Sequence, residues 1–390
     1  MSTAFRTVSL LLAVTVGWLA AKLFGIDDAA SSTVYVFAIN ALLGFGLYAS
    51  TRGIELSEFR QHWGTVLIAV TLGVLAKVAL VFGFLYLFYR RPEHLLLAVA
   101  VAQIDPLSVA AMRARSRLSE SAKTLLAAWA SFDDPITVLL TTYLTVLVLG
   151  TGDTALLGAG LGSFALNFAL NLALAAAAFL LWRLSTRLRP VSATASFRRA
   201  ATRTGVVVVV LGVGLVAVHF SLLLALALIG LFYRPGLNRD LDRAAQIALY
   251  AGTFAIGLVL VNGIDLATGA MLGLAAFLAQ AVVAAILTTR PRWRGDRTRL
   301  ALGQQNGLTA IILALLLEPQ LPGAAAIIAP AIVVVNLLHA LTNTLYDNWR
   351  PLPTAEESDD RLPESPTSTD EPLSGRQEAA VRWFPTLRRA

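Results

Sequence analysis

The chain is built largely from apolar runs of about 20 residues, the length at which an α-helix crosses a lipid bilayer. Of its 390 residues, 57% are hydrophobic and only 14% are charged. The sequence therefore predicts an all-α polytopic membrane protein. Since the chain contains no cysteine, a disulfide framework and a thiolate metal site are both excluded.

Twelve runs qualify as membrane spans. The first could pass for a signal peptide, but it lacks a small-residue cleavage site and is followed by further spans, so we count it as a span. The stretch from Thr204 to Arg234 is short for two passes and long for one, and the charges of the later loops favour two. The predicted spans lie near residues 5–24, 33–50, 63–89, 94–112, 121–148, 154–182, 204–218, 220–234, 244–261, 267–289, 299–317 and 324–346.

Basic residues are concentrated in every second connection between these spans. The alternate connections hold only Lys22, Arg90 and Arg91. Because loops rich in Lys and Arg stay in the cytoplasm, we expect a multi-pass protein of the plasma or inner membrane, surrounded by lipid, with both termini cytoplasmic. The net charge of +7 then reflects topology, and no nucleic-acid partner is expected.

The composition changes after Arg350 to Pro, Ser, Thr and acidic residues. A segment of this kind is too polar to form a core. We therefore expect a transmembrane transporter domain at 1–350 and a disordered cytoplasmic tail at 351–390.

Four ionisable residues lie near the centres of spans, namely Lys77, Asp105, Asp133 and Asp134. An ionised Asp at such a depth costs roughly 2.5 kcal/mol or more, so these groups are expected to face a polar cavity. Consecutive helical residues point about 100° apart, so Asp133 and Asp134 should face different partners. Lys77 is the buried basic candidate for one of them. Burial favours a neutral carboxyl group and a nearby ammonium favours the charged one, so such a site can exchange protons.

Two of these aspartates precede a proline, at Asp105-Pro106 and Asp134-Pro135. Proline donates no hydrogen bond and biases the preceding residue away from helical geometry. In an otherwise helical backbone the carbonyls freed in this way are those of Ala102 and Ser131. Carboxylate and carbonyl oxygens suit a hard monovalent cation. The predicted ion- and proton-binding residues are Asp134, Asp133, Asp105, Ser131 and Ala102, with Asp134 and Asp105 as the metal-cation ligands.

Span eleven carries a less charged version of the same feature, because two glycines and three amides interrupt its apolar run between Leu302 and Thr309. This pattern predicts a second broken helix. Span four would run inward and span eleven outward, as inverted repeats with two crossing discontinuous helices require. The amides are either ligands or helix-packing groups, whereas Asn336 and His339 are interpreted as packing groups. The candidate residues of the second broken helix are Gln304, Gln305, Asn306 and Thr309.

The pattern Gln103-Ile104-Asp105-Pro106-Leu107-Ser108-Val109-Ala110, followed one span later by Phe132-Asp133-Asp134-Pro135, resembles the monovalent cation:proton antiporter superfamily. That family has a Thr-Asp-Pro-type break in its fourth span and an Asp-Asp or Asn-Asp pair in its fifth. By this resemblance, Asp134 matches the principal ion- and proton-binding carboxylate, Asp133 the preceding acid and Asp105 the break residue.

The resemblance covers roughly residues 1–350 and implies exchange of sodium, or of lithium or potassium, for protons by alternating access, without a cofactor. It also implies a homodimer. The core helices would be those at about 63–148 and 267–346, and the remaining helices would form a dimerisation scaffold.

Three positions depart from the family pattern. Ile104 stands where the family often has Thr, and Gln280 stands in span ten where members with an Asp-Asp pair usually have a buried lysine. The arginine that some relatives have in span eleven is also missing. Because span three is the symmetry counterpart of span ten, we hypothesise that Lys77 replaces that lysine as the charge partner of Asp133.

Two other classes of protein were considered. An intramembrane aspartyl protease would need Asp153 and Asp347 together, yet they fall at opposite ends of their predicted spans, so we expect a transporter rather than an enzyme. A sodium-coupled organic anion symporter with a bile acid transporter-like fold stays open as the alternative. That family has a similar Gln-Asn pair in a broken helix, which would use Gln305 and Asn306, but it leaves the Asp133-Asp134 pair unexplained.

Overall fold

The computed structural model describes residues 3–26, 29–52, 63–106, 109, 117–149, 160–187, 212–220, 222–234, 238–303 and 306–349. The described residues form helices and turns, with no β-strand among them. The chain divides into two compact units, Met1–Thr344 and Leu345–Ala390. The predicted tail at 351–390 lies outside the described residues, so its disorder stays a prediction.

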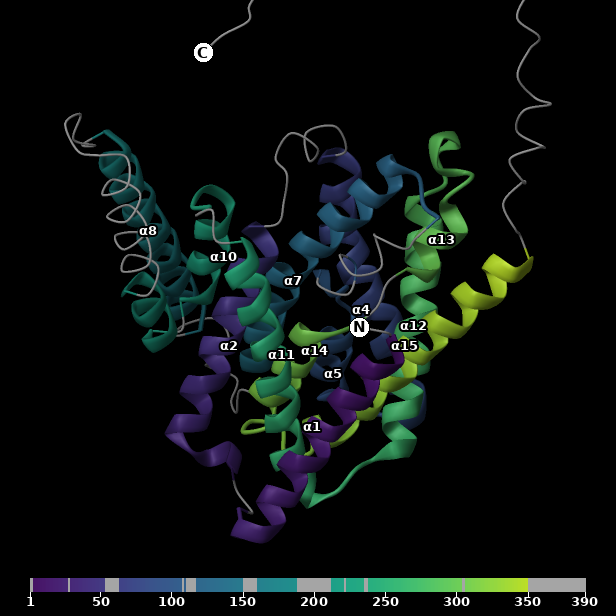
Figure 1. Cartoon of the computed structure of the whole chain (residues 1–390), viewed down its shortest axis with the longest axis horizontal. Coiled ribbons are helices and arrows are strands. Elements are labelled where there is room, and N and C mark those ends of the chain that lie inside the picture. The colour runs from purple at the N-terminus through teal and green to yellow at the C-terminus, as the bar shows by residue number, and fades with distance from the viewer. Residues whose placement is uncertain are drawn as a thin grey trace, which may run out of the picture. The chain divides into compact units, whose positions relative to one another are not determined.

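The helices follow one another along the chain as shown in Figure 1. Three short 3-10 turns, η1 (Ala29–Ser31), η4 (Leu260–Asn262) and η5 (Pro291–Trp293), and one π-helical turn, η2 (Ala69–Gly73), lie between or within them. The α-helices are α1 (Thr3–Phe24), α2 (Thr33–Arg52), α4 (Val74–Tyr89), α5 (His94–Val101), α7 (Glu120–Leu149), α8 (Gly160–Arg187), α10 (Leu223–Phe232), α11 (Asn238–Val259), α12 (Leu266–Leu287), α13 (Arg297–Leu302), α14 (Leu308–Leu317) and α15 (Ala324–Trp349).

Six of the helical stretches are long and apolar enough to cross a membrane, and four shorter apolar helices accompany them. The prediction of an all-α, multi-pass membrane protein is therefore confirmed, whereas the number of twelve spans stays a prediction. In the doubtful stretch 204–234, residues 212–219 are helical and a break at Phe220 precedes α10. Residues 204–211 lie outside the described part.

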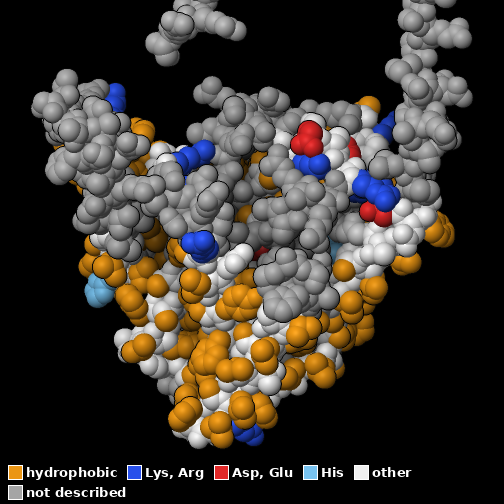
Figure 2. Space-filling model, viewed as in Figure 1, with side chains coloured by type: hydrophobic (Ala, Val, Ile, Leu, Met, Phe, Trp, Pro, Cys, Tyr) orange, Lys and Arg blue, Asp and Glu red, His pale blue; other side chains and the backbone are white. Residues whose placement is uncertain are grey.

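The surface also fits a lipid environment. Figure 2 shows hydrophobic side chains over much of the described face, with most of the Lys and Arg side chains gathered toward one end. Large apolar residues such as Leu23 on α1 and Leu180 on α8 are 72% and 63% exposed. An apolar surface of this extent would cause aggregation in water, and it is stable when acyl chains cover it.

Two short helices, α5 and α14, form the centre of the first unit. The side chains from Leu96 to Val101 on α5 are at most 1% exposed, and α14 is buried along most of its length. Each of these helices carries apolar side chains on every face, and a helix of this kind is stable when it is buried. Helix α5 packs against α4, α7, α12 and α14, and α14 also packs against α2, α7 and α11, so the two short helices meet in the middle (Figure 1).

Both central helices are short because the backbone breaks next to them. Helix α5 ends at Val101 and residues 102–105 are not helical, as the Asp105-Pro106 dipeptide predicts. Helix α13 ends at Leu302, and α14 starts only after Asn306 and Gly307. The two predicted breaks are thus present, whereas most of the predicted second half of span four, at residues 107, 108 and 110–112, lies outside the described part.

Pro135, by contrast, does not interrupt α7, which is helical from Glu120 to Leu149. The hydroxyl of Thr137 donates to the carbonyl oxygens of Asp133 and Asp134, each at 3.0 Å. Hydroxyl donors of this kind are one way in which transmembrane helices tolerate an internal proline.

Glycines allow α1 and α11 to cross at very short range. A Cβ atom placed on Gly257 would overlap the backbone of α1 at Val14, and one placed on Gly17 would overlap the backbone of α11 at Phe254. Small residues at such crossings let the two backbones approach, which is how helices associate in lipid.

We expect Gly257→Ala to destabilise the protein by about 1–3 kcal/mol, because an added methyl group must push two backbones apart. Gly83→Ala is the matched control, since a Cβ at Gly83 on α4 meets no atom within 4 Å. Thermal unfolding in detergent should show a lower melting temperature for the first variant only. Equal melting temperatures for the two variants would contradict the tight crossing.

Candidate functional site

Asp133 and Asp134 on α7 are both buried and face different partners. The Asp133 carboxylate accepts a hydrogen bond from Lys77 Nζ at 2.7 Å and one from the backbone N–H of Ile104 at 2.9 Å. Lys77 is fully buried, and its ammonium lies 5.7 Å from the centre of the Trp129 ring. Asp133 and Lys77 therefore form a buried ion pair in which each group neutralises the other.

Asp134 instead contacts both broken helices. Its Oδ2 accepts a hydrogen bond from the hydroxyl of Thr309 on α14 at 2.8 Å. Its Oδ1 accepts from the side-chain amide of Gln103 at 2.9 Å, in the amide orientation in which the Gln103 oxygen accepts from the backbone N–H of Ala310. One carboxylate on α7 thus binds the break of α5 and the start of α14.

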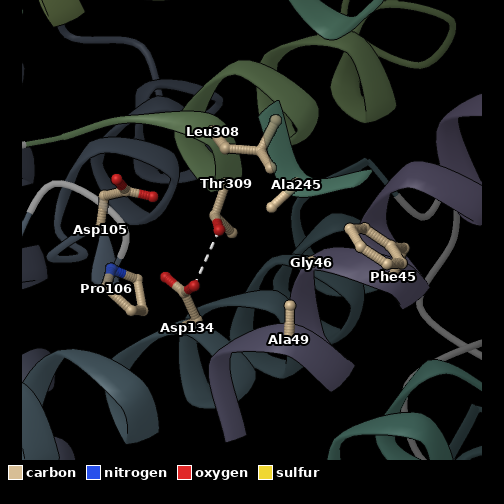
Figure 3. A pocket seen from close by; sticks show the side chains of 9 residues that line it. All are labelled: Phe45, Gly46, Ala49, Asp105, Pro106, Asp134, Ala245, Leu308 and Thr309. Carbon is tan, nitrogen blue, oxygen red and sulfur yellow. Dashed lines mark hydrogen bonds between the residues drawn. The ribbon is translucent and has the colours of Figure 1, made fainter. Parts of the chain in front are cut away.

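A cavity of about 10 Å³ lies beside Asp134. Asp105 and Asp134 are among the residues that line it, together with Pro106, Leu308 and Thr309, as Figure 3 shows. The other lining residues, which come from α2 and α11, are Phe45, Gly46, Ala49 and Ala245.

The cavity is small, and two acidic residues are among those that line it. No described lining residue is basic. Its volume is that of about one water-sized particle. The arrangement therefore favours a proton or a small dehydrated cation.

Gly307 allows the two breaks to approach each other closely. A Cβ atom at this position would overlap the carboxylate of Asp105. The absence of a side chain therefore lets the second broken helix pack directly against the acid of the first.

Neutral amides that are not among the lining residues of the cavity connect the two breaks. The Nε2 of Gln280 on α12 lies 3.2 Å from the carbonyl oxygens of Val101 and Gln103, and 3.1 Å from Asn306 Oδ1. Asn306 Nδ2 donates to Val101 O at 3.0 Å. Asn336 on α15 in turn binds both the backbone N–H and the carbonyl of Asn306, at 3.0 and 2.7 Å.

The structure brings some of the predicted residues together and separates others. Asp105, Asp134 and Thr309 share the cavity, and the Lys77–Asp133 pair lies beside them without lining it. Asn306 belongs to the amide network. The predicted residues that are not among the lining residues are Ala102 and Ser131, and those outside the described part of the chain are Gln304 and Gln305.

Sequence reasoning missed Gln103 and Gly307 as site residues. Gln103 stands two residues before Asp105 in the same motif, so a polar residue next to a break in an apolar span was the available signal. Gly307 was one of the glycines that predicted a break in span eleven, but nothing in the sequence indicated its contact with Asp105.

The donors at the site suit a monovalent cation better than a multivalent metal ion. The described residues contain no group of three His, Cys, Asp or Glu side chains that could hold a metal ion. Asp105 and Asp134 carry carboxylates and Thr309 carries a hydroxyl, and oxygen ligands of these kinds are preferred by hard cations.

The fold resembles that of a sodium proton antiporter. The chain superimposes on the sodium proton antiporter MjNhaP1 from Methanocaldococcus jannaschii with a TM-score of 0.62, over 86% of this chain and 92% of that chain, at 17% sequence identity. The antiporter-like fold predicted from the sequence is therefore confirmed. No protein-family model matches the sequence, and no curated protein does.

We expect Thr309→Val to weaken the binding of a small alkali cation at this site by tenfold or more. Valine keeps the shape but removes the donor to Asp134, and a hydrogen bond to a charged group contributes about 1.5–3 kcal/mol. Thr253→Val is the matched control, because the hydroxyl of Thr253 donates to Leu249 O within α11. The measurement is the cation concentration that half-saturates the purified protein, and equal values for both variants would argue against a role for Thr309.

Proposed function

We propose that the protein is a secondary active transporter that exchanges a monovalent alkali cation, foremost Na⁺ and with Li⁺ and K⁺ as further candidates, for protons. The observation that carries this proposal is the pair Asp105 and Asp134 at one small cavity between two broken helices. The antiporter fold supports the same reading.

Competition for one carboxylate would couple the two ions. A proton on Asp134 neutralises it, and a cation bound to its ionised form does the same, so the two states exclude each other. Either neutralisation lowers the cost of a buried charge. Such a site can change its access from one side of the membrane to the other with a proton or a cation bound, but not with neither. This is the condition for exchange without uncoupled movement of either ion.

Lys77 has a supporting role in this proposal. Its Nζ lies 2.7 Å from the Asp133 carboxylate, so Asp133 already has a partner of opposite charge and Asp134 is left to exchange ions. Asp133, the acid that precedes Asp134, in turn offsets the charge of Lys77 in the core.

The broken helices suggest how access would alternate. Asp134 is bound by Gln103 and Thr309, which flank the two breaks. In an alternating-access cycle, the core helices at about 63–148 and 267–346 would move as one body against a scaffold of the remaining helices. We propose that this scaffold forms a homodimer in the plasma or inner membrane, with both termini cytoplasmic.

The test is a pH gradient imposed across proteoliposomes that contain the purified full chain. Adding Na⁺, Li⁺ or K⁺, with no organic solute present, should dissipate the gradient and rank the three cations. Protein-free liposomes serve as the control for passive leak.

The opposite result identifies the alternative. If none of the cations moves protons between about pH 6 and pH 9 from correctly inserted protein, exchange is excluded. Cation uptake that requires an added organic anion would then establish the sodium-coupled symporter.

A further inference from the structure

Both ring nitrogens of His339 on α15 lie against oxygen atoms. The side chain is fully buried. Its Nδ1 lies 2.8 Å from the carbonyl oxygen of Leu302 at the end of α13, and its Nε2 lies 3.0 Å from Gln280 Oε1 on α12. The ring of Phe277 packs edge-on against the imidazole.

Both of these oxygens are fixed as acceptors. A backbone carbonyl can only accept a hydrogen bond. The Gln280 amide cannot exchange its oxygen and nitrogen, because its Nε2 already faces the carbonyl oxygens of Val101 and Gln103. Turning the amide over would bring its oxygen against both of them.

A neutral imidazole carries one N–H and can donate to only one of these oxygens. The unprotonated nitrogen would then direct its lone pair at the other oxygen. An imidazolium carries two N–H groups and satisfies both. Burial works against the charged ring, whereas two charge-assisted hydrogen bonds favour it.

The neighbouring elements offer the ring no carboxylate. Helix α12 carries no titratable side chain, α13 carries Arg297 and Arg299, and Tyr346 and Asp347 lie further along α15. Among the described residues none of these side chains hydrogen-bonds to His339. Its proton would therefore be held by neutral acceptors.

We propose that His339 is a second proton-binding site, separate from Asp134, because only the doubly protonated ring can donate to both of these oxygens. The proton joins α15 to α13 and, through Gln280, to the carbonyls at the break of α5. When it leaves, the contact between Nε2 and Gln280 Oε1 becomes a contact between two acceptors and must open. The site would thus tie the packing around both breaks to pH.

Thermal unfolding of the full chain in detergent tests this site without any transport assay, so its outcome is independent of the proposed exchange. A group that holds its proton more tightly in the folded than in the unfolded protein adds stability at low pH and loses it as the pH rises. His339→Gln should therefore lower the melting temperature by several degrees near pH 5 and by less near pH 9. His219→Gln, the same substitution at an exposed position, should produce no such trend. A loss that grows as the pH rises would overturn the proposal, because it would mean that the buried ring is neutral.

A second measurement leaves His339 in place. In a chain in which His62, His94 and His219 are replaced by Gln, ¹⁵N-labelled histidine reports His339 alone. Near pH 6, both ring nitrogens should show the chemical shifts of protonated nitrogen. One protonated and one unprotonated nitrogen throughout the range from about pH 5 to pH 9 would reject the second proton site.

Discussion

Asp134→Asn is expected to reduce cation-driven proton movement to the level of protein-free liposomes. Asparagine has the shape of aspartate and can still accept a hydrogen bond from Thr309, although it loses the one from Gln103, so most of the local packing survives. It cannot bind and release a proton, and it brings no negative charge to the cavity that Asp105 shares. A variant that folds but does not exchange would place the coupling at this carboxylate.

Asp265→Asn is the matched control. Asp265 caps α12 outside its apolar run, and its carboxylate accepts from the backbone N–H of Thr268 at 3.0 Å. Hydrogen bonds from Thr268 lower the pKa of Asp265, and asparagine retains the ability to cap a helix. This variant should transport at the wild-type rate. Retained exchange in Asp134→Asn would contradict the proposed site even if the protein proved to be an antiporter.

Lys77→Met is expected to cause the largest loss of stability, about 3–5 kcal/mol, because it leaves a charged Asp133 without its counterion in a dry core. The second carboxylate oxygen, Oδ1, has no hydrogen-bond partner that could compensate. Unfolding in detergent would measure the loss. The double variant with Asp133→Asn should recover most of it, since neither charge is then buried alone.

Lys123→Met serves as the comparison for Lys77→Met. Lys123 pairs with Glu120 at 2.8 Å, but the Glu120 side chain is 82% exposed. An exposed pair of this kind contributes about 0–1 kcal/mol, so this variant should unfold close to the wild type. If Lys77→Met and its double variant were equally unstable, the ion pair would not be what stabilises this part of the core.

The membrane helices and the two breaks were predictable because their causes are local. Apolar runs of bilayer length need no tertiary information, and Asp105-Pro106 breaks a helix through its own covalent geometry. The contact between Lys77 and Asp133 was expected from the free-energy cost of burying a charge in the membrane. An ammonium group at this depth is stabilised when it pairs with a carboxylate. The role of the Lys77–Asp133 pair in cation:proton exchange stays a prediction.

The contacts between the two breaks were not predictable, because they depend on how α5, α12, α14 and α15 meet. Gln103 reaches Asp134 only because α7 passes beside the break. His339 looked like a single polar residue in an apolar span, for which a packing role was the simplest interpretation, and Gln280 stood out only as a departure from the family pattern. The hydrogen bonds of these two side chains can be assigned only when the positions of their partners are known.

The most direct test of the central claim is proton release from purified protein in a weakly buffered detergent solution when Na⁺ is added. If one carboxylate holds either ion, the wild type must release protons as Na⁺ binds, and it must release fewer at high pH, where the site is already empty of protons. Asp134→Asn should release none. Na⁺ binding without proton release from the wild type, or release that persists in Asp134→Asn, would contradict competition at Asp134.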